Sequence, residues 1–318
     1  MAPSFSSPTT TFSFTLEPGK QGQITTVSEI IEDEDDTLTV EKRRLCRHLG
    51  LEDETGHPPT NPLQIQPLFF IEKTPDSRGP PCNLPGCNRR IEPGDLRLAL
   101  NPAMESNHWF RASSDFYHIR CFEKIADFSQ ADFLDRVQPL TRNTWELRGL
   151  KASSVRDGSY IVPGGVERLI LEWKVTRGMW IDKRDGVYDE RAYYIDEGFD
   201  DLLHKAGSST YIPRGRPAGL DLYEHYALSQ LLAPNESDGP QDQQEWNLFA
   251  HYLDFTAKTP SNPHELSMML QRWEDDVTLA WREDRDAKNA LAQKATRALK
   301  RLSAIPIPQA GSNRLGYY

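Results

Sequence analysis

The organisation of this chain is decided by two short stretches, RGPPCNLPGCNRRIEPGDLRLAL at residues 78–100 and FYHIRCFEKIADF at residues 116–128. Each stretch supplies one close pair of metal-binding side chains. Zinc in a structural site takes four Cys or His ligands in a tetrahedron, usually as two close pairs presented on turns. The spacing therefore predicts a zinc site with four ligands: Cys82, Cys87, His118 and Cys121.

Cysteine usage favours a metal site over a disulfide scaffold. Only 4 cysteines occur in 318 residues, which is typical of a protein from a reducing compartment. Three of them belong to the predicted site, and the fourth lies in the pair Cys46-x-His48. That pair and His108 are the alternative sources of a fourth ligand.

The sequence around the ligands predicts a small fold that needs its metal. Short strands are expected at Gln64–Lys73, Leu96–Leu100 and Phe116–His118, and a helix at His118–Phe128. Pro and Gly turns separate these pieces, and a unit of this size lacks the apolar surface to fold unaided. We expect residues 64–150 to form a zinc-stapled unit of short antiparallel strands and a helix.

The N-terminal part differs in composition from the metal-binding stretches. Residues 1–63 begin with a Ser/Thr/Pro-rich stretch and include the acidic run Glu32–Asp36, so we expect them to be largely disordered. Within them, Leu38–Leu51 could form one or two helical turns closed by Gly50. The chain shows neither a secretory signal nor an apolar run of about 18 residues. We therefore expect an intracellular, soluble protein that does not contact a membrane.

Helical periodicity dominates the C-terminal half. Apolar residues recur at helical spacing in 166–173, 220–231 and 246–253. A long helix is expected to start at Asn262 with Pro263 as its first residue, and to run to about Leu302. The overall prediction is an α+β protein with a separate, mostly helical domain at residues 159–302 and a tail at 303–318.

The net charge of −10 is unevenly spread. Residues 1–75 carry a net −6, residues 151–318 a net −4, and residues 76–150 are neutral, with nine of their ten basic residues being arginine. Arginine suits phosphate contact and stacking on bases, so a small basic face is compatible with nucleic-acid binding. The neutrality of the same segment is equally compatible with a protein–protein adaptor.

The metal-binding stretches resemble the poly(ADP-ribose) polymerase-type zinc finger. The likeness covers roughly residues 76–150 and rests on the ligands together with Ile91, the Gly94–Ala99 segment and the aromatic pair before His118. The family has two residues between its first cysteines, whereas Cys82 and Cys87 are separated by four. The resemblance implies a compact Zn²⁺-stapled fold that binds DNA at breaks, nicks or ends, and so a nuclear protein of DNA repair.

The same resemblance implies which side chains contact DNA. Arg78 and Arg97 match arginines that hold the phosphate backbone. Met104, Trp109 and Phe110 lie in the loop that would cover an exposed base pair. Trp109 and Phe110 are the expected stacking residues, and the alternative for both is packing against the small core of the finger itself. Stacking of one base on an aromatic ring is worth about 1–3 kcal/mol.

The motifs of catalysis are missing, so we expect a binding protein. None of the 8 histidines precedes a glycine, which excludes the His-Gly motif of ADP-ribosyltransferases. The segment Lys183–Gly186 resembles a ligase nucleophile motif, but no partner motif lies at a workable distance. The alternatives to DNA binding are a zinc-stabilised adaptor and an RNA or chromatin accessory factor. The basic clusters Lys42–Arg44 and Lys300-Arg301 are compatible with nuclear import.

Overall fold

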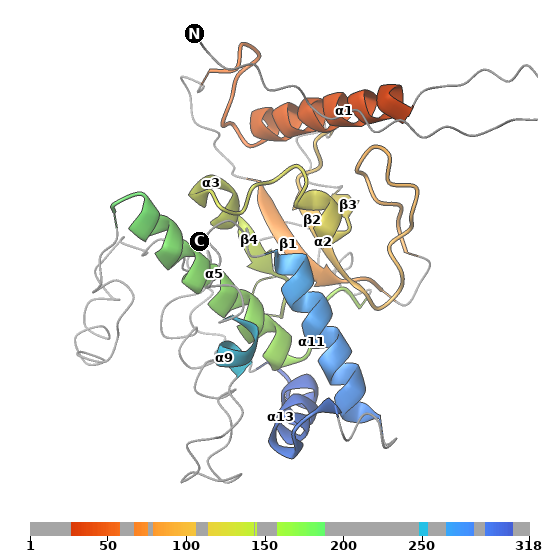
Figure 1. Ribbon diagram of the computed structural model, residues 1–318, viewed down its shortest axis with the longest axis vertical. Helices are drawn as coiled ribbons and strands as arrows, with labels where there is room; N and C mark the ends of the chain where they lie inside the picture. The colour runs from red at the N-terminus through yellow and green to blue at the C-terminus, as the bar shows by residue number, and fades with distance from the viewer. Residues whose placement is uncertain are drawn as a thin grey trace, which may run out of the picture.

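A four-stranded sheet lies at the centre of the structure (Figure 1). This computed structural model describes residues 27–57, 67–75, 79–105, 114–142, 144, 158–187, 248–253, 265–282 and 290–307. The strands lie in the order β3-β2-β1-β4. Their bounds are β1 (Leu68–Lys73), β2 (Leu96–Asn101), β3 (Asp115–Tyr117) and β4 (Val137–Pro139).

The pairing of the strands sets which side chains meet. β1 and β2 are antiparallel, with Phe70 opposite Ala99 and Glu72 opposite Arg97. β3 pairs antiparallel with β2, and β4 pairs parallel with β1. Strands were predicted in the regions of β1, β2 and β3, whereas β4 was not predicted.

Both faces of the sheet are covered by other parts of the chain. Because side chains alternate along a strand, Phe69 and Ile71 point into the larger core while Phe70 points to the other face. There Phe70 packs with Ala99 and Leu140 in a second, smaller cluster. A polar residue on either face can therefore be buried.

Seven helices are described around this sheet, and together with it they give the α+β content that was predicted. Their bounds are α1 (Val27–His48), α2 (Ile119–Phe122), α3 (Ala131–Leu134), α5 (Gly164–Arg184), α9 (Leu248–Tyr252), α11 (Leu266–Trp281) and α13 (Gln293–Ala304). Among the described helices, none combines the length and apolar character that a membrane crossing requires.

The C-terminal helices do not form a separate domain, which corrects the predicted division at residues 150–159. One hydrophobic cluster runs from the metal-binding segments into α5 and α11. The Phe128 ring meets Trp173 of α5 with 5.7 Å between centroids. Lys174 of α5, fully buried, donates hydrogen bonds of 2.8 Å to the carbonyl oxygens of Asp135 and Val137. The metal-binding segments bury their aromatic surface against α5, so the two parts share one core.

The described part of the N-terminal region, residues 27–57, contains more helix than predicted. α1 begins at Val27 and extends well beyond the one or two turns expected at 38–51. Its C-terminal end is anchored because Leu45 of the helix and Leu49, the residue after it, are buried in the main core. Gly50 ends the helix region as expected, with a positive φ of 68°.

The long C-terminal helix is divided into two. α11 ends at Trp281, α13 begins at Gln293, and the two helices pack against each other. A straight helix over 262–302 would be about 60 Å long at about 1.5 Å per residue. It could not bury both Trp273 and Leu302 in one core, whereas two helices packed against each other bury both residues. The expected helix start at Asn262-Pro263 and the helix at 220–231 lie outside the described residues.

Candidate metal centre

The first pair of ligands lies on a tight loop. The Cys87 N–H donates to Leu84 O at 3.0 Å, which closes the loop over Pro85 and Gly86. Gly86 has φ +80°, a left-handed conformation that favours glycine. The loop is longer by two residues than in the zinc-finger family that the sequence resembles, yet it folds back so that both sulfurs point the same way.

The second pair lies where β3 passes into α2. His118 follows the last strand residue, and its carbonyl oxygen accepts the Cys121 N–H at 2.9 Å. This first helical turn places the Cys121 side chain beside the His118 ring. The ligands of this pair are therefore held by backbone geometry, one turn apart.

The four side chains converge as the sequence predicted. Their ligand atoms all lie within 4.8 Å of one another. Cys87 Sγ is 3.7 Å from Cys121 Sγ, and His118 Nδ1 is 3.6 Å from Cys87 Sγ and 3.7 Å from Cys121 Sγ. Bonds of about 2.3 Å directed to the corners of a tetrahedron place thiolate sulfurs about 3.8 Å apart. The cluster therefore has the dimensions of a tetrahedral metal site.

The His118 ring is oriented by a second contact. Its Nε2 lies 3.2 Å from the carbonyl oxygen of Arg90, so Nε2 carries the proton and donates it there. The Nδ1 lone pair is then directed toward the three sulfurs. Metal-bound histidines commonly use their other nitrogen in this way, and the contact raises their basicity as ligands.

A hydrogen bond between Cys82 and Cys121 shifts the pKa values of the two thiols in opposite directions. The hydrogen bond with Cys121 lowers the pKa of Cys82 to about 5, although burial opposes this change. The same contact raises the pKa of Cys121, which keeps its proton as the donor. Metal binding displaces such protons because the thiolate is the ligand form. Three thiols and an imidazole are a donor set that zinc prefers.

The segments on either side of the first ligand loop pack tightly against each other. A Cβ added at Gly79 would meet Ile91 O at 1.7 Å, so no other residue fits there. Arg90 donates to Gly79 O at 2.8 Å, and Ile91 is fully buried. Asn83 ties the loop to β3 by donating to Asp115 at 2.7 Å. A hydrogen bond therefore connects the loop of the first ligand pair to the strand that precedes the second pair.

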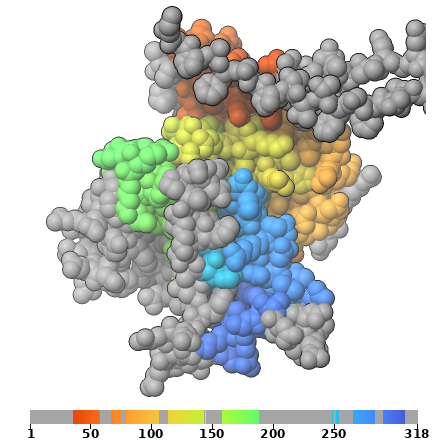
Figure 2. All heavy atoms as spheres, in the orientation of Figure 1, coloured from red at the N-terminus to blue at the C-terminus, as the bar shows by residue number. Residues whose placement is uncertain are grey.

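A groove of about 900 Å³ lies beside the centre, between α1, the ligand loop and α11. Figure 2 shows these segments on one face, with α1 in red at the top, the ligand segments in yellow and orange below it, and α11 in blue below the yellow segment. Three exposed cations line it: Arg89, Arg120 and Lys124. Asp95 and Glu274 lie on its α11 side. Burial raises the pKa of Glu274 to about 7, and Asp95 adds to this rise.

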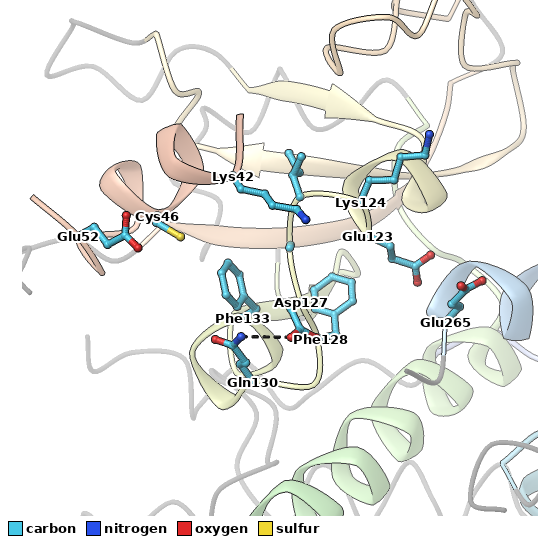
Figure 3. A pocket seen from close by; sticks show the side chains of 12 residues that line it. Lys42, Cys46, Glu52, Glu123, Lys124, Asp127, Phe128, Gln130, Phe133 and Glu265 are labelled. Carbon is cyan, nitrogen blue, oxygen red and sulfur yellow. Dashed lines mark hydrogen bonds between the residues drawn. The ribbon is translucent and has the colours of Figure 1, made fainter. Parts of the chain in front are cut away.

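A second hollow of about 530 Å³ lies on the other side of Lys124 (Figure 3). Its floor is apolar, with Phe128 and Phe133, and Cys46 lines it from α1. Its charges are mainly acidic, and the carboxylates outnumber the two lysines, Lys42 and Lys124. The carboxylates are Glu52, Glu123, Asp127 and Glu265. A negative surface therefore adjoins the cationic groove.

The alternative ligands do not join the cluster within the described part of the chain. His48 Nε2 is 2.8 Å from the carbonyl oxygen of Pro102. Cys46 is a free thiol, half-buried in the second hollow. His108 lies outside the described residues.

The structure does not place Arg97 where a phosphate could reach it, which corrects the expectation for that residue. The residue is 5% exposed, and its Nη2 lies 2.6 Å from Glu72 Oε1. Its guanidinium also stacks on Phe116, 4.0 Å from the ring centroid. The physical reason is the register of β1 and β2, which sets Glu72 opposite Arg97 on a covered face. Arg78, Trp109 and Phe110 lie outside the described residues.

Sequence reasoning overlooked the residues that surround the centre. Arg120 directly precedes Cys121 and Lys124 follows it three residues later, but nothing in the sequence showed that α1 and α11 would form a groove beside them. Arg89 lies two residues after Cys87 and is exposed. A basic residue within three positions of a ligand is the signal that could have identified this set.

Comparison with protein-family models gives no match for this chain. Comparison with curated proteins gives no match. Comparison with solved structures likewise gives none.

Proposed function

We propose that the protein holds one structural Zn²⁺ through Cys82, Cys87, His118 and Cys121, and that this unit binds DNA. The observation that carries the proposal is the Cys₃His cluster, whose sulfur and nitrogen atoms have tetrahedral spacing beside a groove with exposed cations. The zinc stabilises the fold and takes no part in a reaction. In this proposal the protein is a non-catalytic nuclear factor that recognises DNA structure.

The cations of the groove support a phosphate partner. Arg89, Arg120 and Lys124 are all exposed and converge from two different segments on the edge of the metal centre. Cationic side chains that displace condensed counterions supply an affinity that is independent of sequence and falls with salt. They replace Arg97 as the proposed phosphate contacts. Trp109 and Phe110 are kept as proposed stacking residues on the basis of sequence alone.

The test is a titration of the zinc-loaded full chain with nicked, closed and single-stranded DNA at two salt concentrations. Arg120→Ala and Lys124→Ala should weaken binding to every probe and reduce the salt slope by about one unit each. Arg297→Ala, an exposed arginine on α13, is the matched control and should leave both quantities unchanged. Equal affinity for nicked and closed duplex would retain DNA binding and contradict break recognition.

A protein partner is the second candidate, and a specific observation favours it. The acidic hollow beside Lys124 and the net charge of −10 both disfavour a long contact with DNA. A zinc-loaded chain that binds none of the three probes would contradict the DNA proposal and favour the adaptor.

A further inference from the structure

The first turn of α11 is capped by a residue from a distant part of the chain. Its own N-cap residue, Glu265, makes no side-chain capping bond. Instead Glu123 accepts the Ser267 N–H at 3.0 Å on Oε1 and the Ser267 hydroxyl on Oε2. Figure 3 shows Glu123 directed toward Glu265 at the start of α11. Unpaired N–H groups and the positive end of the helix dipole favour a carboxylate at this position.

Glu123 is directly connected to the metal centre. It is the residue after α2, and its N–H donates to Ile119 O at 3.0 Å. Cys121 lies two residues before it, on the same turn. A four-residue helix is not stable by itself, because nucleation of a helical turn is costly. The position of α2, and with it that of Glu123, therefore depends on contacts that include the metal ligands.

The far half of α11 is held independently of α2. The Tyr252 hydroxyl donates to Asp276 at 2.7 Å, and the Tyr252 ring packs on Trp273 with 5.7 Å between centroids. α11 also packs along α13. Loss of the Glu123 contact should therefore free the first turns of α11 while its second half stays in place.

We infer that metal occupancy controls the docking of the first turns of α11, with Glu123 as the positioning residue between the two. With the metal bound, α2 is fixed and Glu123 caps α11. Without it, α2 loosens and the segment from Leu266 to Arg272 opens. Since Leu270 and Gln271 line the groove beside the centre, metal loss also removes one wall of that groove. This inference rests on the proposed zinc site.

The test is hydrogen exchange of the full chain, compared between the zinc-loaded and the chelated protein. Chelation should raise exchange in α2 and residues 266–272 and leave α5 protected. Glu123→Ala, measured at full zinc occupancy, should raise exchange in 266–272 by about fivefold, in scale with the loss of one helix cap. Ser267→Ala should give a smaller rise in exchange, since the backbone N–H of residue 267 still donates to Glu123. Thr278→Ala, exposed on the same helix, is the matched control and should leave 266–272 unchanged.

Two outcomes would contradict the inference and leave the proposed zinc site valid. One is a chain that binds zinc in equal amount but shows the same protection of 266–272 before and after chelation. The other is a uniform rise over α5 and α11, because the coupling would then be global unfolding. A chain that binds no zinc contradicts the proposed function itself, and the metal content measured on the same samples separates these cases.

Discussion

At the scale of single residues, Arg97 shows how strand register decides the role of a charge. Arginine between two leucines on a strand suggests a solvated side chain, because alternation places it away from the leucines. Here the opposite face is covered as well, and Glu72 lies directly across on β1. Burial lowers the pKa of Arg97 to about 10, as expected for a cation removed from water. Its role is structural.

We predict that Arg97→Ala destabilises the protein by about 3–5 kcal/mol, because it leaves the buried Glu72 carboxylate without its cation. Urea unfolding of the zinc-loaded chain measures this change. The double variant Glu72→Leu with Arg97→Met should recover most of the loss, since it removes both charges. A stable Arg97→Ala variant with weakened DNA binding would show instead that Arg97 contacts phosphate.

At the scale of elements, the apolar face of α5 was predicted correctly, whereas the burial of its polar residues was not predicted. Its stripe of Val166, Leu169, Ile170 and Trp173 is buried, as the periodicity indicated. Glu167, on another side of the helix, is also fully buried. Periodicity identifies the most apolar face of a helix, and it cannot show that the remaining faces are covered too. That depends on segments far away in the sequence.

Glu167 gives this helix a testable dependence on pH. Burial raises its pKa from 4.5 to about 8, so between these values the folded protein binds a proton that the unfolded chain releases. Stability should therefore fall as pH rises through this range, with a slope of at most about 1.4 kcal/mol per unit from this group. Glu167→Gln should flatten the profile in urea unfolding between pH 5 and 8. A variant whose profile parallels the original protein would contradict this assignment.

The metal centre was the part best predicted from sequence, for a chemical reason. Ligand type and spacing are local properties, so the two pairs could be recognised without knowing the fold. Their convergence within 4.8 Å is what the structure shows. The groove, the Glu123 contact and the burial of Arg97 all depend on pairings over long sequence separations. No local pattern contains that information.

At the scale of the whole molecule, the metal centre and the C-terminal helices belong to one core. Phe128 packs on Trp173, and Lys174 donates to the carbonyl oxygens of Asp135 and of Val137, the first residue of β4, so neither part buries its surface alone. The sequence suggested two domains because the hydrophobic pattern becomes helical after about residue 158. That change of pattern marks a change in secondary structure here, and it does not mark a boundary between cores.

Metal analysis of the purified full chain tests most directly whether the Cys₃His cluster holds a single zinc ion. We predict about one zinc per chain, as one tetrahedral four-ligand site requires. His118→Ala and Cys121→Ser should lose the metal, whereas Cys46→Ser, which removes the one cysteine outside the cluster, should retain it. A chain that contains no zinc after expression with added metal, or that loses zinc equally in Cys46→Ser, would contradict the account.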